Sequence, residues 1–173
     1  MIVSTWTGLV PAEEGTYTFF DPAAAWEGVP LNGFDLATAN GFIGQGAPWA
    51  VYVITGCLFG PVRLTIEVHD GPVAAGDQWT EIVESEFVSH SGTLRLIQWG
   101  GEHIATLEGL LTPGPWGLRA CARGRDLARS REWGPDDEPA EDHLLQLWPG
   151  PHQGAVVRTT DTLGATMRGE PRS

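Results

Sequence analysis

Five arginines fall within residues 119–131 of a chain that contains ten arginines and no lysine. A guanidinium group presents a planar fork of N–H donors, which suits carboxylates and other planar oxyanions. Arg119 and Arg123 would share one face of an extended strand, and Trp116 precedes them in the sequence. One interpretation is therefore a binding site for a carboxylated or sugar ligand. The alternative, which we favour, is that the arginines pair internally with surplus carboxylates such as Glu84.

A row of carboxylates occupies the segment 79–88, WTEIVESEFV. On an extended strand Glu84 and Glu86 share one face and lie about 7 Å apart, which is near the separation of the two carboxyl groups in glycosidases. Glu81 falls on the opposite face. Since any solvated strand face supplies such pairs, a carboxylate-dependent hydrolase is the lesser interpretation, and we expect the protein not to be an enzyme.

Other catalytic and metal-binding patterns are missing from the sequence. The five histidines are scattered without an HxH or HExxH arrangement, so we predict neither a metal nor a cofactor. A site shared by His69 and His103 would require distant strands to meet. No GxSxG segment occurs, and the glycine-rich segment 41–49 lacks the lysine of a phosphate-binding loop. Cys57 and Cys121 lie in apolar runs, where free cysteine behaves as a small hydrophobic residue, and whether they pair stays open.

Short strands between turns must position these side chains. The chain contains 23 glycines and 13 prolines, and the segments between them are short and rich in β-branched and aromatic residues. Such spacing is typical of a β-sandwich or barrel. Apolar and polar residues alternate along 62–69, so one face of that strand should be buried. The sequence predicts an all-β, antiparallel sandwich with strands at 16–20, 50–55, 62–69, 80–88, 93–99, 103–107, 116–122, 143–148 and 155–160.

Helices should contribute little to this fold. We expect one or two short helices, at 35–40 and at 126–131. The segment 129–142, RSREWGPDDEPAED, is predicted to be a charged loop that is either mobile or functional. No linker or repeat divides the chain, so we predict a single domain over all 173 residues, with an ordered core at 15–163 and a frayed C-terminal tail.

The net charge of −12 restricts the partners that the protein can bind. Residues 1–110 contain 13 carboxylates and only two arginines. Such a surface repels nucleic acid and anionic lipid, and it attracts basic proteins, although a charge that serves solubility is the simpler explanation. The N-terminal residues lack a signal-peptide pattern, and no apolar stretch has the length of a membrane span. We therefore expect a cytoplasmic protein without nucleic-acid or membrane partners.

Five segments occur in an order that is similar to a known arrangement: TYTFF (16–20), DLATANGFIGQG (35–46), VRLTIEVHDGPV (62–73), WTEIVESEFV (79–88) and LTPGPWGLRACARGRD (111–126). The layout resembles the small bacterial family of competence protein J, the inhibitor of a nuclease involved in DNA uptake. Its P-G-x-aromatic-x-L strand corresponds to PGPWGL in the last segment. The resemblance covers most of 15–150 and implies a β-sandwich that binds another protein. The family pattern lacks the arginine cluster and the 129–142 loop.

The chain also resembles uncharacterised actinobacterial proteins that end in RGRD followed by LLQLWP, here 123–126 and 144–149. Our favoured hypothesis is an acidic protein-interaction module, an inhibitor or immunity-type protein for a basic partner such as a nuclease. The contacts are expected from carboxylates and exposed aromatic anchors, namely Asp70, Asp77, Trp79, Glu81, Glu84, Glu86, Trp99 and Glu102. The alternatives are the ligand site at Arg119, Arg123 and Trp116 and, less favoured, the hydrolase.

Overall fold

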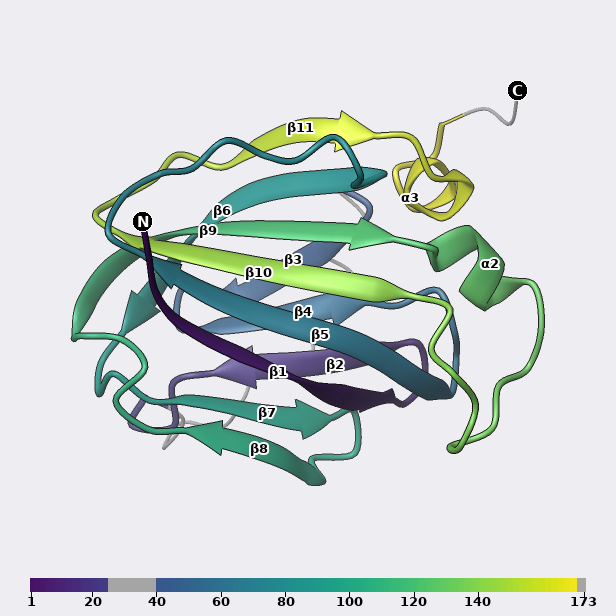
Figure 1. Cartoon of the computed structure of the whole chain (residues 1–173), viewed down its shortest axis with the longest axis horizontal. Helices are drawn as coiled ribbons and strands as arrows, with labels where there is room; N and C mark the ends of the chain where they lie inside the picture. The colour runs from purple at the N-terminus through teal and green to yellow at the C-terminus, as the bar shows by residue number, and fades with distance from the viewer. Residues whose placement is uncertain (25–39, 171–173) are drawn as a thin grey trace.

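Two β-sheets make up most of the structure, a computed structural model that describes residues 1–24 and 40–170 (Figure 1). Among these residues the first sheet has the strand order β1-β5-β10-β9-β6-β11, and the second has the order β3-β4-β2-β7-β8. The elements are β1 (Ile2–Ala12), β2 (Thr16–Phe20), β3 (Ile43–Ala47), β4 (Ala50–Ile54), β5 (Gly60–His69), β6 (Glu81–Ser89), β7 (Leu94–Gln98), β8 (His103–Leu107), β9 (Gly114–Arg123), α2 (Arg125–Arg129), β10 (Asp142–Pro149), β11 (Ala155–Thr159) and α3 (Thr162–Met167). The predicted mainly-β fold is confirmed.

One strand pair departs from the expected antiparallel arrangement. β10 runs parallel to β5, with Asp142 beside Arg63 and Leu147 beside Val68. β10 lies between β9 and β5 and is antiparallel to β9. β5 runs in the same direction as β10, so the pair β5–β10 is parallel. The first sheet is therefore mixed, whereas the described pairs of the second sheet are all antiparallel.

Each of the nine predicted strands matches an observed strand, with ends that differ by at most two residues. β1 and β3 were not predicted. β1 contains Pro11 and carries exposed apolar residues on an edge strand, so it shows no simple alternation of buried and exposed types. β3 has the sequence IGQGA, whose two glycines were interpreted as part of a turn.

Secondary structure is present on both sides of the predicted core at 15–163. β1 begins at Ile2, and α3 extends to Met167. The side chain of Asp161 accepts a hydrogen bond from the backbone N–H of Gly164 at 2.6 Å and so caps α3. α2 fits the short helix expected at 126–131, and the helix expected at 35–40 lies outside the described residues except for Asn40.

The main hydrophobic core lies between the two sheets. In β5 the side chains of Leu64, Ile66 and Val68 are at most 3% exposed and belong to this core, as the alternation along 62–69 predicted. The second sheet contributes Tyr17, Phe19, Val51, Val53, Leu94 and Leu96. Burial of an aliphatic or aromatic side chain contributes about 1.5–3 kcal/mol, so this layer holds the sheets together.

Several connections meet at one end of the sandwich, on the right in Figure 1. The end of β1 pairs with the start of β5, and the start of β10 pairs with the end of β9. In the second sheet the start of β2 lies beside the ends of β4 and β7. We call the resulting surface the loop end, and it consists of residues 13–15, 55–59, 99–102 and 124–141.

Gly124 lets the chain turn from β9 into α2. Its φ is +81°, and a Cβ there would lie 2.0 Å from the carbonyl oxygen of Ala140. Gly109 has a φ of +63°, and a Cβ at that position would meet nothing within 4 Å. Gly109→Ala should therefore lower the free energy of unfolding by about 1–2 kcal/mol, the cost of a left-handed backbone. Gly124→Ala should lower it clearly more, because the 140–141 backbone must also move. Urea unfolding of both variants measures the difference, and equal losses would contradict this account.

Candidate functional site

The residues expected to form one acidic face are spread over several parts of the molecule. Asp70 follows β5, at the end of the sandwich opposite the loop end, and pairs with the amino terminus of Met1. Asp77 lies in the connection from β5 to β6 and approaches Arg158 to 3.2 Å. Glu86 is half-buried on β6. The structure does not bring these carboxylates together.

Trp99 and Glu102 do lie together, in the turn between β7 and β8 at the loop end. Trp99 is 52% exposed, and Glu102 is exposed as well. The backbone N–H of Gly100 donates to Glu13 at 2.8 Å, so this turn contacts the turn between β1 and β2. These two predicted residues therefore occupy a surface where connections from both sheets meet.

Trp79 is buried and cannot serve as an exposed aromatic anchor. It packs with Ile82, Cys121 and Leu144 on the outer face of the first sheet. The guanidinium of Arg123 lies over its ring, 5.4 Å from the centroid. The expectation of an exposed Trp79 is wrong because the connection from β5 to β6 covers this apolar strip and places the indole against it.

Glu84 is held within the fold by Arg119 and His152. Nε and Nη2 of Arg119 donate to the same Glu84 oxygen at 2.8 and 2.7 Å, and His152 lies 2.8 Å from the other oxygen. Arg119 also donates to the Val73 carbonyl oxygen and to Gln146. Its guanidinium is therefore occupied by internal partners, as the structural interpretation of the arginine cluster predicted.

The ligand pocket expected at Arg119, Arg123 and Trp116 is not formed. Successive side chains of a strand point to opposite faces, so Trp116 faces the core while the two arginines face outward. The Trp116 indole N–H donates to the Thr112 carbonyl oxygen at 2.9 Å. Arg123 pairs with Asp142 at 2.8 Å instead of reaching toward a ligand.

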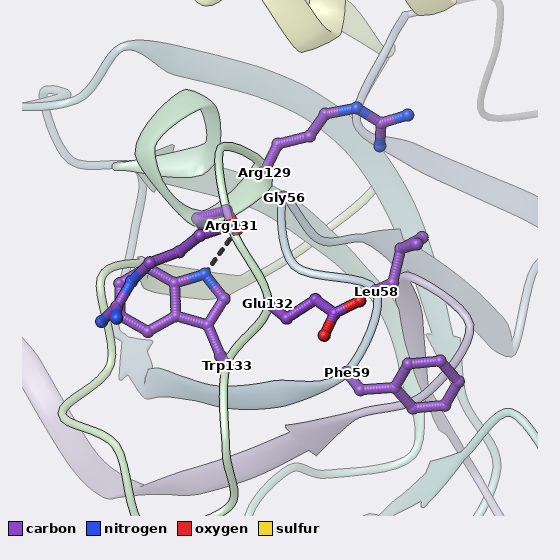
Figure 2. A pocket seen from close by; sticks show the side chains of 8 residues that line it. Gly56, Leu58, Phe59, Arg129, Arg131, Glu132 and Trp133 are labelled. Atoms are coloured by element: carbon purple, nitrogen blue, oxygen red, sulfur yellow. Dashed lines mark hydrogen bonds between the residues drawn. The ribbon is translucent and has the colours of Figure 1, made fainter.

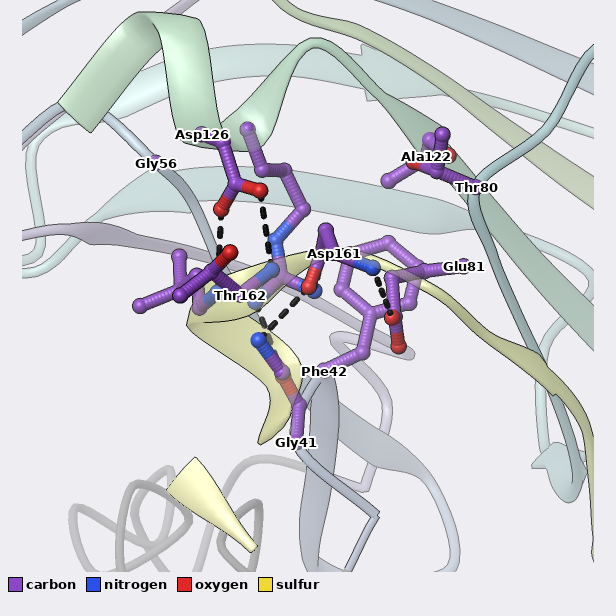
Figure 3. Close-up of polar contacts among 12 residues, drawn as sticks. Gly41, Phe42, Gly56, Thr80, Glu81, Ala122, Asp126, Asp161 and Thr162 are labelled. Carbon is purple, nitrogen blue, oxygen red and sulfur yellow. Dashed lines mark hydrogen bonds and ion pairs between the residues drawn. The ribbon is translucent and has the colours of Figure 1, made fainter. Parts of the chain in front are cut away.

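Glu81 belongs to a buried ionic cluster where α3 docks (Figure 3). One carboxylate oxygen accepts the backbone N–H of Asp161 at 3.1 Å, and the other lies 3.4 Å from Arg168. Burial, reinforced by the Asp161 carboxylate, raises the pKa of Glu81 to about 8. Glu81 therefore cannot contact a partner, in contrast to the expectation, because its face of β6 points inward.

A hydrogen-bonded chain of three buried side chains was not found by sequence reasoning. The Tyr17 hydroxyl lies 3.0 Å from Nδ1 of His143, and Nε2 of His143 lies 2.6 Å from Glu141. The second Glu141 oxygen accepts the Gly56 backbone N–H at 2.8 Å. All three side chains are at most 1% exposed, so a substrate has no access to them. This series of hydrogen bonds connects the second sheet, β10 and the loop end.

The cysteines and histidines do not form a catalytic or metal site in the described part of the chain. Cys57 and Cys121 are free and buried, and burial raises the pKa of each thiol to about 12, which leaves neither as a thiolate nucleophile. His69 lies on the first sheet and His103 on the second. Among residues 1–24 and 40–170 no three histidine, cysteine or acidic side chains are grouped to hold a metal ion. No helix described there is long and apolar enough to cross a membrane.

The loop end contains a pocket of about 630 Å³ (Figure 2). Leu58 and Phe59, which are 57% and 53% exposed, line one side, and Trp133 lines the other. The Trp133 indole N–H donates to the Ala128 carbonyl oxygen at 2.6 Å, and the Arg131 guanidinium lies 3.7 Å from the centre of the Trp133 ring. A second depression continues from Phe59 and Trp133 toward β1.

Exposed carboxylates lie in three connections of the loop end, and one of them, Glu132, lines this pocket together with Arg129 and Arg131. The carboxylates come from the β1–β2 turn, the β7–β8 turn and the loop after α2: Glu14, Glu102, Glu132, Asp136 and Glu138. Figure 2 shows the Glu132 carboxylate directed toward Leu58 and Phe59. The loop 129–142 was predicted from the sequence to be mobile or functional, and its aromatic and acidic residues were the available signal. The contacts of this loop with residues 55–59 could not be predicted from the spacing of residues in the sequence.

Two solved structures share this fold. ComJ from Bacillus subtilis, an inhibitor of the DNA degrading activity of NucA, superposes with a TM-score of 0.60 and 12% identity, over 86% of this chain and 98% of that chain. Crocagin biosynthetic gene J matches with a TM-score of 0.51 and 16% identity, over 84% of this chain and 97% of that chain. No protein-family model and no curated protein matches the sequence. A ComJ-like fold is therefore established, at the level of structure.

Arg119→Met should destabilise the protein strongly, because it leaves the largely buried Glu84 carboxylate without its main partner. Breaking a buried ion pair in this way costs about 3–5 kcal/mol. Arg123→Met is the matched control, since Arg123 is half-exposed and Asp142 keeps Arg63 as a partner. Its cost should be about 1 kcal/mol or less. Urea unfolding of the two variants measures both values, and similar losses would refute the internal role of Arg119.

The raised pKa of Glu81 predicts a loss of stability with rising pH. The folded protein holds this proton up to about pH 8, whereas the unfolded chain releases it near the ordinary value of 4.5. The contribution of Glu81 is therefore complete below the lower pKa and falls as pH rises through the higher one. In Glu81→Gln the free energy of unfolding should no longer show the part of its decline with pH that comes from Glu81. Measuring the free energy of unfolding of the parent and the variant between pH 4.5 and about pH 8 tests this prediction, and parallel curves for the two proteins would contradict it.

Proposed function

We propose that this chain is a protein-interaction module of the inhibitor type, which binds a basic protein such as a nuclease through its loop end. The observation that carries the proposal is the ComJ-like fold, since ComJ is an inhibitor of a nuclease activity and nearly its whole length superposes. The net charge of −12 supports a basic partner. Carboxylates on the inhibitor would occupy the cationic site that otherwise holds phosphates.

The loop end has the composition of a protein-binding surface. Protein interfaces obtain most of their affinity from a few aromatic and apolar anchors that are surrounded by polar groups. Phe59, Leu58 and Trp99 are exposed apolar side chains there, and exposed carboxylates lie in three of its connections. These acids would steer a cationic partner toward the anchors before contact.

The same proposal places the protein in the cytoplasm and assigns it no catalytic step. Both cysteines are free, which suits a reducing compartment. The buried Tyr17–His143–Glu141 chain has the groups for proton transfer, but it is closed to solvent and contributes to the fold. The proposal includes no nucleic-acid partner, since the net charge of −12 would repel phosphates.

A small-molecule binding function is the second candidate, and the Arg131–Trp133 stack favours it. Arg129 and Arg131 line the pocket in Figure 2, so a carboxylate could contact a guanidinium while an apolar group packs on the indole. This site replaces the one expected at Arg119 and Arg123. A small ligand that binds there would be insensitive to charge changes on the β7–β8 turn.

Capture experiments with the immobilised chain test the inhibitor proposal. From a lysate of the source organism, a basic protein should bind at low salt and be released at high salt, because salt screens exposed charges over about 8 Å at physiological ionic strength. The variant E102K/E132K reverses two exposed carboxylates of the loop end and should weaken binding by at least tenfold. The captured protein, once purified, should lose its activity when the parent chain is added.

The variant E86K/E108K is the control, since it makes the same charge change away from the loop end. It should retain binding. Failure to capture any basic protein at low salt would refute the inhibitor function. A partner that is indifferent to E102K/E132K but lost with E86K/E108K would instead assign binding to a surface outside the loop end that contains Glu86 or Glu108.

A further inference from the structure

β1 is a long edge strand whose outer edge has no partner strand among the described residues. β5 pairs with it on one side, and it ends the strand order of the first sheet. Its 11 residues, IVSTWTGLVPA, include no charged side chain. Natural edge strands are usually protected by charges, by proline or by a bulge, because their free N–H and C=O groups pair with other strands. Here the bulge is at Ile2–Ser4 and the proline is Pro11, so the segment between them is unprotected.

The exposed side chains of this segment form a nearly palindromic pattern. Val3, Thr5, Thr7 and Leu9 are exposed, whereas Trp6 between them packs against the core. In an antiparallel pair of two copies centred on Trp6, Thr5 of each copy would face Thr7 of the other. Val3 would face Leu9. Threonine pairs and aliphatic pairs are both favourable across neighbouring strands.

The absence of charged side chains on β1 makes this edge suitable for a second copy. Two molecules of net charge −12 repel each other, and the uncharged β1 lets their backbones approach without opposed carboxylates. The nearest carboxylate on the neighbouring strand is Glu67, beside Thr5. In the centred arrangement the row through Glu67 continues to Thr65 of the other copy. Neighbouring strands lie about 4.8 Å apart, and three strand-to-strand spacings separate the two copies of β5. The Glu67 carboxylates of the two copies therefore lie farther apart than a Debye length of about 8 Å.

We propose that two copies of this chain pair through β1, antiparallel and centred on Trp6, so that their first sheets become one continuous sheet. The dimer has a twofold axis at Trp6 and is isologous, with the same strand used by both copies. The pairing satisfies the free edge and covers Val3 and Leu9, which are 67% and 57% exposed. It does not depend on the proposed inhibitor function.

Sedimentation equilibrium of the purified chain tests this arrangement with two charge variants. In T5K/T7K, positions 5 and 7 of opposite copies would present like charges to each other, and the dimer should dissociate. The loss would not come from greater overall repulsion, since this variant lowers the net negative charge. In T5K/T7E the same positions present opposite charges, so the dimer should persist. Both variants lose the Thr7–Thr65 side-chain hydrogen bond, and circular dichroism should confirm that both fold.

Each other outcome overturns the proposal. A parent chain that is monomeric at high micromolar concentration excludes self-pairing and leaves the edge to a strand of another protein. A T5K/T7K variant that remains dimeric places the interface elsewhere. Dissociation of both variants alike excludes the register centred on Trp6.

Discussion

The Arg125 guanidinium is buried where the two sheets, α2 and the start of α3 meet, and the loop end depends on how it is held. It donates to the Gly41 carbonyl oxygen at 2.8 Å, lies 3.3 Å from an Asp161 oxygen and stacks over Phe42 at 4.8 Å. Removing such a cation from water costs several kcal/mol, which only close partners can offset. A Cβ on Gly56 would lie 2.0 Å from the Arg125 carbonyl oxygen, so the β4–β5 connection passes directly against the backbone of Arg125. The position of Leu58 and Phe59 follows from this contact.

Charged residues divide into two groups that the sequence does not distinguish. Glu81, Glu84 and Asp161 are buried or largely buried and hold elements together, and their partners within the fold are Arg168, Arg119 and Arg125, respectively. The remaining acids are largely on the surface, together with a smaller number of arginines. Each internal pair removes one carboxylate together with one arginine from the surface, so the net charge of −12 stays with the remaining, largely exposed groups.

The sequence predicted most strands because their local patterns agree with the final fold. The alternation in β5 was enough, whereas β1 carries the mixed exposure of an edge and β3 has the glycines of a turn. The site was harder to predict, since it depends on which strand face is covered. Glu81 and Trp79 were expected on the surface, but Trp79 packs on Cys121 and Leu144 and Glu81 contacts Asp161, all of which are distant in the sequence. Trp99 and Glu102 lie in a turn, where exposure follows from local structure alone.

The position of β10 in the middle of the first sheet has a consequence for how the chain folds. β10 pairs with β5, about 80 residues earlier, and also with β9. During synthesis β5 and β9 therefore emerge from the ribosome with unsatisfied inner edges, and they must wait for residues near the C-terminus before the sheet can close. Closure over such sequence separations is slow, because the entropy of a large loop is lost before the contacts form. A nascent chain that stops before Asp142 would expose two strand edges at once, which makes such an intermediate prone to aggregation.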